Sequence, residues 1–121
     1  MEDGPAGQAT STDIAARLGA LAEADLLALR LAAQVLGHKA ALRDRPAVVG
    51  WFTDLELAVK MEMARRGIGF VLGRSSEPRL PASADDEDRR LLDEHLGLLC
   101  GNGQLSDAVR AFCSALRKAL V

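Results

Sequence analysis

Aromatic and thiol side chains are scarce in this chain of 121 residues. It contains no tyrosine, one tryptophan, three phenylalanines, two histidines and two cysteines. So few histidines and cysteines leave little material for a metal centre or a disulfide framework. The apolar 49% consists mostly of alanine and leucine instead. Both residues favour helices, which predicts an all-α fold.

The sequence also lacks a large excess of one sign of charge, and it lacks long apolar runs. The formal net charge is −2, which gives no general electrostatic case for binding nucleic acid or an anionic membrane. No stretch of 18 uninterrupted apolar residues is present, so no membrane span is expected. The N-terminus has neither a basic start nor an apolar run, which argues against a signal peptide. We therefore expect a cytoplasmic protein, and the Ala, Gly, Leu and Arg bias is typical of a GC-rich, bacterial-like genome.

Helical spacing of the apolar residues predicts a compact bundle of five helices. A flexible tail, 1–11, precedes a single helical domain, 12–121, that begins with a short helix. Two helical hairpins follow, at about 23–66 and 84–121, and an extended connector, 67–83, joins them.

Local residue chemistry predicts where several helices begin and end. Gly37 is expected to end the second helix, and Gly67 the third. Asp44 is the candidate N-cap of the third helix, while Ser106 or Gln104 caps the fifth. These signals are short-range, so they predict boundaries and not packing.

The two central helices carry wider apolar arcs than a helix with one neighbour needs. The second helix is apolar almost all round, and the third carries two apolar rows. This width predicts that the surface is shared with a second copy or another protein, with Trp51 as the anchor. The alternative is that the third helix is central and wrapped by the other four, with Trp51 in the core. The predicted interface residues are Val48, Trp51, Phe52, Leu55, Val59 and Phe70.

Catalytic and metal-binding patterns are not apparent. The glycines of "GIGFVLG" follow a helix, whereas phosphate-binding glycines follow a strand and open a helix. His95 lies on an apolar face and is expected to be packed and hydrogen-bonded. Asp93 and Glu94 are adjacent and point apart. We expect no catalysis, no cofactor and no metal site.

The two cysteines are expected to be free. Cys100 ends one helix, whereas Cys113 lies well inside the next, an axial offset of about 12 Å at the helical rise per residue. That separation is too large for a disulfide. Both are therefore interpreted as buried thiols in a reducing compartment.

The middle of the chain offers an alternative function. The segment "RRGIGFVLGR", followed by "DDEDRRLLDEHLGLL", resembles the end of the recognition helix, the wing and the next long helix of the MarR family of winged-helix regulators. The resemblance implies a DNA-binding transcriptional regulator whose wing strand would alternate Ile68, Phe70 and Leu72. Its phosphate contacts would be Arg65, Arg66, Arg74 and Arg79. The preceding "AVVGWFTDLELA", however, is apolar where a recognition helix offers polar side chains to bases.

Two functional hypotheses result. The first is a non-catalytic, regulatory helical module that forms a homodimer and binds an unknown protein partner. The alternative is a degenerate winged-helix-like DNA-binding regulator.

Overall fold

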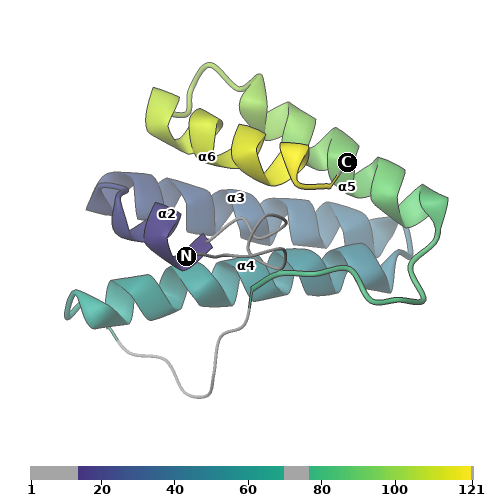
Figure 1. The fold of residues 1–121 in the computed structure, drawn as a ribbon, viewed down its shortest axis with the longest axis horizontal. Coiled ribbons are helices and arrows are strands. Elements are labelled where there is room, and N and C mark those ends of the chain that lie inside the picture. Colours follow the sequence, from purple (N-terminus) through teal and green to yellow (C-terminus); the bar gives the residue numbers. More distant parts are fainter. Residues whose placement is uncertain (1–13, 70–76, 121) are drawn as a thin grey trace, which may run out of the picture.

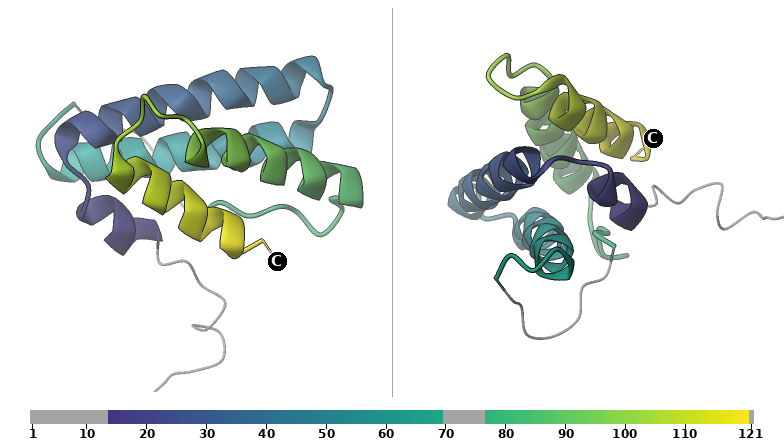
Figure 2. Two further views of the ribbon diagram at one scale, coloured as in Figure 1. Left: turned by 90° about the horizontal axis from the view of Figure 1, so that it is seen from above. Right: turned by 90° about the vertical axis from the view of Figure 1, so that its left-hand side faces the viewer.

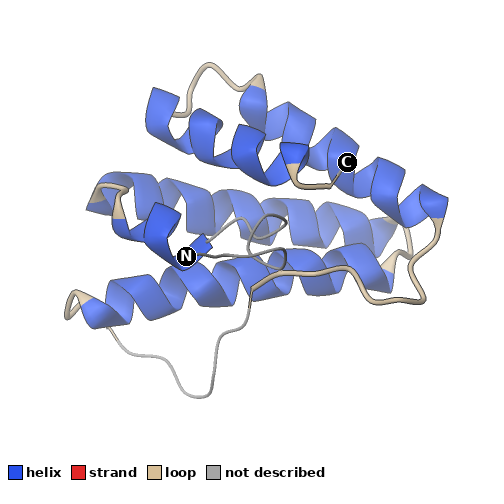
Figure 3. Cartoon of the chain, viewed as in Figure 1, coloured by secondary structure: helices blue, strands red, loops and turns tan. Residues whose placement is uncertain are grey.

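Two helical hairpins stacked on one another form most of the computed structural model, which describes residues 14–69 and 77–120 (Figure 1). Helices α3 (Glu23–Leu42) and α4 (Pro46–Arg65) make the first hairpin. Helices α5 (Asp86–Cys100) and α6 (Asp107–Lys118) make the second. The short α2 (Ile14–Gly19) packs against α4. The prediction of an all-α bundle of two hairpins and a short N-terminal helix is confirmed, and no strand occurs in these ranges (Figure 3).

The arrangement leaves α3 at one edge of the bundle. Seen end-on in the right panel of Figure 2, the α5–α6 hairpin lies across the α3–α4 hairpin, and α2 lies on the side away from α3. Helix α4 contacts α2, α3 and α5. Helix α3 also contacts three helices, α4, α5 and α6, but Leu27, Leu31 and Val35 form a row on it that stays exposed.

Helix α3 is longer than the sequence predicts. It continues through Gly37 to Leu42, so the prediction that Gly37 ends it is wrong. A Cβ atom at Gly37 would lie 3.5 Å from the Cβ of Phe52 on α4, which shows how closely the two helices approach there. Gly37 therefore allows the two helices to pack closely, and it does not end α3.

The turn between α3 and α4 also differs from the prediction. Asp44 has a left-handed backbone with φ 56°, whereas an N-cap residue takes an extended conformation. Arg45 is the N-cap of α4, with Pro46 in the first turn. Asp44 reverses the chain direction and caps nothing.

The remaining helix ends follow their local signals. Gly67 ends α4 with φ 81°, as predicted. Asp85 and Asp88 form a reciprocal capping box at the start of α5, in which the Asp88 amide donates to the Asp85 carboxylate over 2.8 Å. The Ser106 hydroxyl accepts from the Val109 amide over 3.1 Å and caps α6. Such caps typically contribute about 0.5–2 kcal/mol each.

One continuous apolar core lies between the layers. Its largest fully buried side chains come from α2 to α6 and include Leu18, Leu26, Phe52, Leu55, Leu92, Leu96 and Leu116. Trp51 and Phe52 pack edge to face, with ring centroids 5.1 Å apart. None of the helices in the described ranges is long and apolar enough to cross a membrane.

The two thiols are free, as predicted, but they are not equally buried. Cys113 is fully buried, and burial raises the pKa of its thiol to about 12. Cys100 is half-buried at the end of α5. The prediction of two buried thiols therefore holds for Cys113 and is wrong for Cys100.

A buried carboxylate at the end of α4 attaches α2 to the bundle. Glu62 carries a charge and is nevertheless only 7% exposed. The Arg66 Nε donates to Glu62 over 2.8 Å, and its Nη2 donates to the carbonyls of Leu18 and Gly19 over 3.1 and 3.2 Å. One guanidinium thus satisfies both the buried carboxylate and the carbonyl end of α2.

We expect Arg66→Ala to destabilise α2 specifically. Six residues are too few for an isolated helix, and losing hydrogen bonds to a charged group costs about 1.5–3 kcal/mol. Hydrogen exchange should show faster exchange of the α2 amides than of the α4 amides. Arg65→Ala is the matched control, because Arg65 pairs with Glu62 over 3.3 Å but has no hydrogen bond to α2 in the described residues. Equal effects of the two variants on α2 would contradict this assignment.

Candidate interaction surface on helix α3

The predicted interface residues of α4 lie in the core of a single chain. Val48, Leu55 and Val59 are 0% exposed, Phe52 is 1% and Trp51 is 3%. They present no surface to a second chain, so their assignment is corrected to core packing. These residues are buried because neighbouring helices of the same chain surround α4. The wide apolar arc of α4 is therefore explained by packing within one chain, which was the alternative to a shared surface. Phe70 lies outside the described residues.

Of the five large apolar side chains that are exposed in the described residues, four lie on α3 and the fifth is Leu98 of α5. Leu27, Leu31, Val35 and Leu42 are 46, 62, 48 and 75% exposed, and we call these four residues the α3 stripe. At about 100° of rotation per residue, they share one face of the helix. The opposite face buries Leu26, Leu29, Ala33, Leu36 and Ala40. Helix α3 is therefore apolar on both its core side and its outer side.

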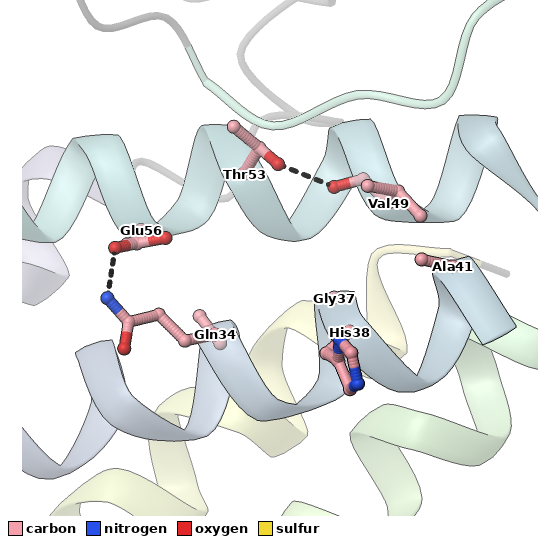
Figure 4. A pocket seen from close by; sticks show the side chains of 8 residues that line it. Gln34, Gly37, His38, Ala41, Val49, Thr53 and Glu56 are labelled. Carbon is pink, nitrogen blue, oxygen red and sulfur yellow. Dashed lines mark hydrogen bonds between the residues drawn. The ribbon is translucent and has the colours of Figure 1, made fainter.

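A shallow groove runs beside the α3 stripe, between α3 and α4 (Figure 4). Its volume is about 260 Å³. The lining residues are Ala33, Gln34, Gly37, His38, Ala41, Val49, Thr53 and Glu56. Three of the five α3 residues among them are alanine or glycine, so the groove exists because α3 carries small side chains there.

A polar cluster closes one end of the groove. The Gln34 amide donates to the Glu56 carboxylate, and Lys60 Nζ lies 3.1 Å from the same carboxylate. Partial burial acts to raise the pKa of Glu56, but the hydrogen bonds from Gln34 and Lys60 and the charge of Arg30 outweigh it and lower that pKa. Glu56 is thus an ionised, fully paired group, which suits a structural tie between α3 and α4 better than proton transfer.

The charges on α3 are divided between its ends. Glu23 and Asp25 lie in the first turn, whereas Lys39 lies in the last turn and Arg43 follows it. None of these four forms an ion pair within 4.0 Å in the part of the chain that the structure describes. Along the length of α3, the unpaired charges are thus acidic at the start and basic at the end.

Three of the four arginines of the DNA-binding alternative, Arg65, Arg66 and Arg79, lie in the described residues. Arg65 and Arg66 lie together at the end of α4, where both pair with Glu62. Arg79 is exposed, with Glu77 at 3.9 Å. Arg74 lies outside the described residues, as do Phe70 and Leu72 of the expected wing. DNA binding therefore stays a prediction from the sequence.

His95 is the most unusual polar side chain in the core. It is 6% exposed and its ring centroid lies 6.0 Å from that of Phe52. Neither ring nitrogen has a hydrogen-bond partner among the described residues, so the prediction of a hydrogen-bonded histidine is wrong. Burial lowers its pKa, the charges of Lys39 and Arg43 lower it further, and Glu94 opposes them. His95 is therefore neutral at neutral pH.

The other candidate groups are paired or isolated. Asp93 accepts two hydrogen bonds from Arg117, over 2.7 and 3.1 Å, and these lower the pKa of its carboxyl group. In the described residues no three His, Cys, Asp or Glu side chains gather as metal ligands would. These geometries resemble structural ion pairs more than an acid–base or metal site.

The α3 stripe was not singled out by sequence reasoning, although its signal was present. Leu27, Leu31 and Val35 recur every four residues in a helix that has few polar positions. The wide apolar arc of this helix indicated an extra contact surface. Helical periodicity alone did not show which part of the arc would pack in the bundle and which part would stay exposed.

Comparisons with protein-family models, with curated proteins and with solved structures found no match to this chain.

Proposed function

We propose that this chain is a non-catalytic, regulatory helical module that binds protein through the α3 stripe. The observation that carries the proposal is the exposure of Leu27, Leu31 and Val35, at 46, 62 and 48%, in one row. Single exposed leucines are common on protein surfaces, whereas aligned ones are typical of contact surfaces. Burial of apolar surface contributes about 25 cal/mol per Å², so covering this row would drive association.

The groove beside the stripe supports the same function. Recognition of an amphipathic helix depends on apolar anchors about one turn apart that enter a groove. Helix α3 offers both parts, since the anchors of its stripe lie next to the small-residue groove. Glu56, the carboxylate that lines the groove, is already paired with Gln34 and Lys60 within the chain. The surface therefore suits the binding of an apolar protein surface better than the binding of a charged ligand.

The test compares capture of proteins by three tagged forms of the chain expressed in cells. Leu31→Glu places a charge in the middle of the stripe and should reduce retention of specific binding proteins at least about tenfold, since desolvating an unpaired charge is costly. Ala111→Glu is the matched control, because Ala111 is exposed on α6, away from the stripe. Circular dichroism should show that all three forms are equally helical. Identical sets of retained proteins would contradict the proposed function.

A further inference from the structure

We propose that the surface that covers the α3 stripe is a second copy of this chain, with the two α3 helices packed antiparallel about a two-fold axis. This inference rests on the proposed function and identifies the partner. Two separate features of α3, its charge distribution and the shape of its groove, specify the same alignment of the two helices.

The first feature is the charge distribution. Asp25 lies near the start of α3 and Lys39 near its end, and both lack an ion-pair partner within the described residues. Their positions differ by 14 residues, which is two heptads, so they lie on the same side of α3. In an antiparallel pair about a two-fold axis, the acidic start of each helix faces the basic end of the other. A parallel pair would instead bring like charges together.

The second feature is the groove. Four of its α3 residues, Gln34, Gly37, His38 and Ala41, have the spacing i, i+3, i+4 and i+7. Four residues with this spacing form the hole that receives one side chain of a facing helix in knobs-into-holes packing. Glycine and alanine keep this hole free of bulky side chains, and its far wall is formed by Val49 and Thr53 of α4.

Leu27 of the second copy is suited to fill this hole. It lies one turn before Arg30 and two turns before Gln34, the α3 residues whose side chains reach Glu56 of α4. Leu27 is therefore on the α4 side of the stripe, as the groove is. Two-fold symmetry brings this side of one helix against the same side of the other.

Both features require the same register. When Leu27 of one copy lies over the centre of the hole, between Gly37 and His38 of the other, Asp25 lies opposite Lys39. The two-fold axis then passes close to Leu31, the most exposed of the first three stripe residues at 62%. Leu31 of each copy thus packs against Leu31 of the other, and the interface spans most of a helix about 30 Å long.

The decisive experiment is charge reversal followed by sedimentation of the purified full-length chain. The wild-type chain should sediment as a dimer. Asp25→Lys alone, or Lys39→Asp alone, should raise the dimer dissociation constant about fivefold to tenfold, as expected for two rim ion pairs turned repulsive. An equal mixture of the two variants, or the double variant, should return it to near the wild-type value. Lys118→Asp, on an exposed position of α6, is the control that should leave it unchanged.

A second measurement locates the contact. In a Cys100→Ser background, Leu31→Cys should form a covalent dimer on mild oxidation, because the symmetry axis brings the two thiols together. Ala111→Cys, exposed on α6, should not do so. A dimer without the Leu31→Cys crosslink and without rescue by the mixed variants would overturn the antiparallel α3 contact.

The outcomes separate this inference from the proposed function. A chain that stays monomeric in sedimentation, yet captures another protein in a Leu31-dependent way, overturns the second copy and leaves the proposed function standing. A monomer whose captured proteins do not depend on Leu31 overturns both.

Discussion

Phe52→Ala is expected to lower the free energy of unfolding by about 3–5 kcal/mol, the range for a large aromatic side chain removed from a packed core. Phe52 is 1% exposed and lies where three helices meet. Its ring packs against Trp51 on its own helix and His95 on α5, and its Cβ faces Gly37 on α3. The resulting cavity would border α3, α4 and α5 together, so no single helix could move to fill it.

Urea unfolding followed by far-ultraviolet circular dichroism measures this loss. The control is Thr53→Ala at the next position, where the side chain is exposed and its hydroxyl donates to the Val49 carbonyl of its own helix. Substitutions at such positions usually change stability by less than about 0.5 kcal/mol. Similar losses for the two variants would show that the core is not organised around Phe52.

His95→Leu is expected to stabilise the fold, and more strongly in acid. At neutral pH the gain should be about 1–3 kcal/mol, since the variant removes two buried ring nitrogens that have no hydrogen-bond partner. Leucine restores an apolar side chain between Phe52 and the α5 core.

The acid effect follows from the direction of the pKa shift. Because burial lowers the pKa of His95 in the folded chain, the unfolded chain binds the proton more readily. The wild-type chain should therefore lose stability as the pH falls below about 6.5, by up to about 1.4 kcal/mol per pH unit. Above that pH both states carry a neutral ring, so this contribution is constant.

Urea unfolding at a series of pH values tests this assignment. His95→Leu should flatten the stability curve between about pH 6.5 and 5, where histidines titrate but most carboxylates do not. His38→Gln is the control, because it removes the other histidine at an exposed position outside the core. If the free energy of unfolding of His95→Leu depended on pH as steeply as that of the wild-type chain, another group would be the cause of the acid sensitivity.

Local chemistry made the helices predictable. The glycine after α4 and the serine before α6 act within one turn of the chain, and the structure uses both at helix ends. The order of the helices and their pairing into hairpins follow from short connections. Such features depend on neighbours in the sequence, which can be read directly.

Tertiary packing decided the features that sequence reasoning missed. Gly37 is a helix terminator by local rules, but the approach of Phe52 makes it an interior packing residue. Trp51 and Leu31 are both apolar residues of broad apolar helices. Only the placement of α3 at the edge of the bundle and α4 beneath its neighbours buries Trp51 and exposes Leu31. The sequence could indicate a surplus of apolar surface without locating it.

The depth of Cys113 has a chemical consequence of its own. With a thiol pKa of about 12, the reactive thiolate amounts to about one molecule in 100,000 at neutral pH. Full burial also keeps peroxides and electrophiles from the sulfur atom. The resistance of this residue to oxidation is thus not intrinsic to the cysteine but conferred by α6 remaining docked, and it disappears in any molecule whose second hairpin has opened.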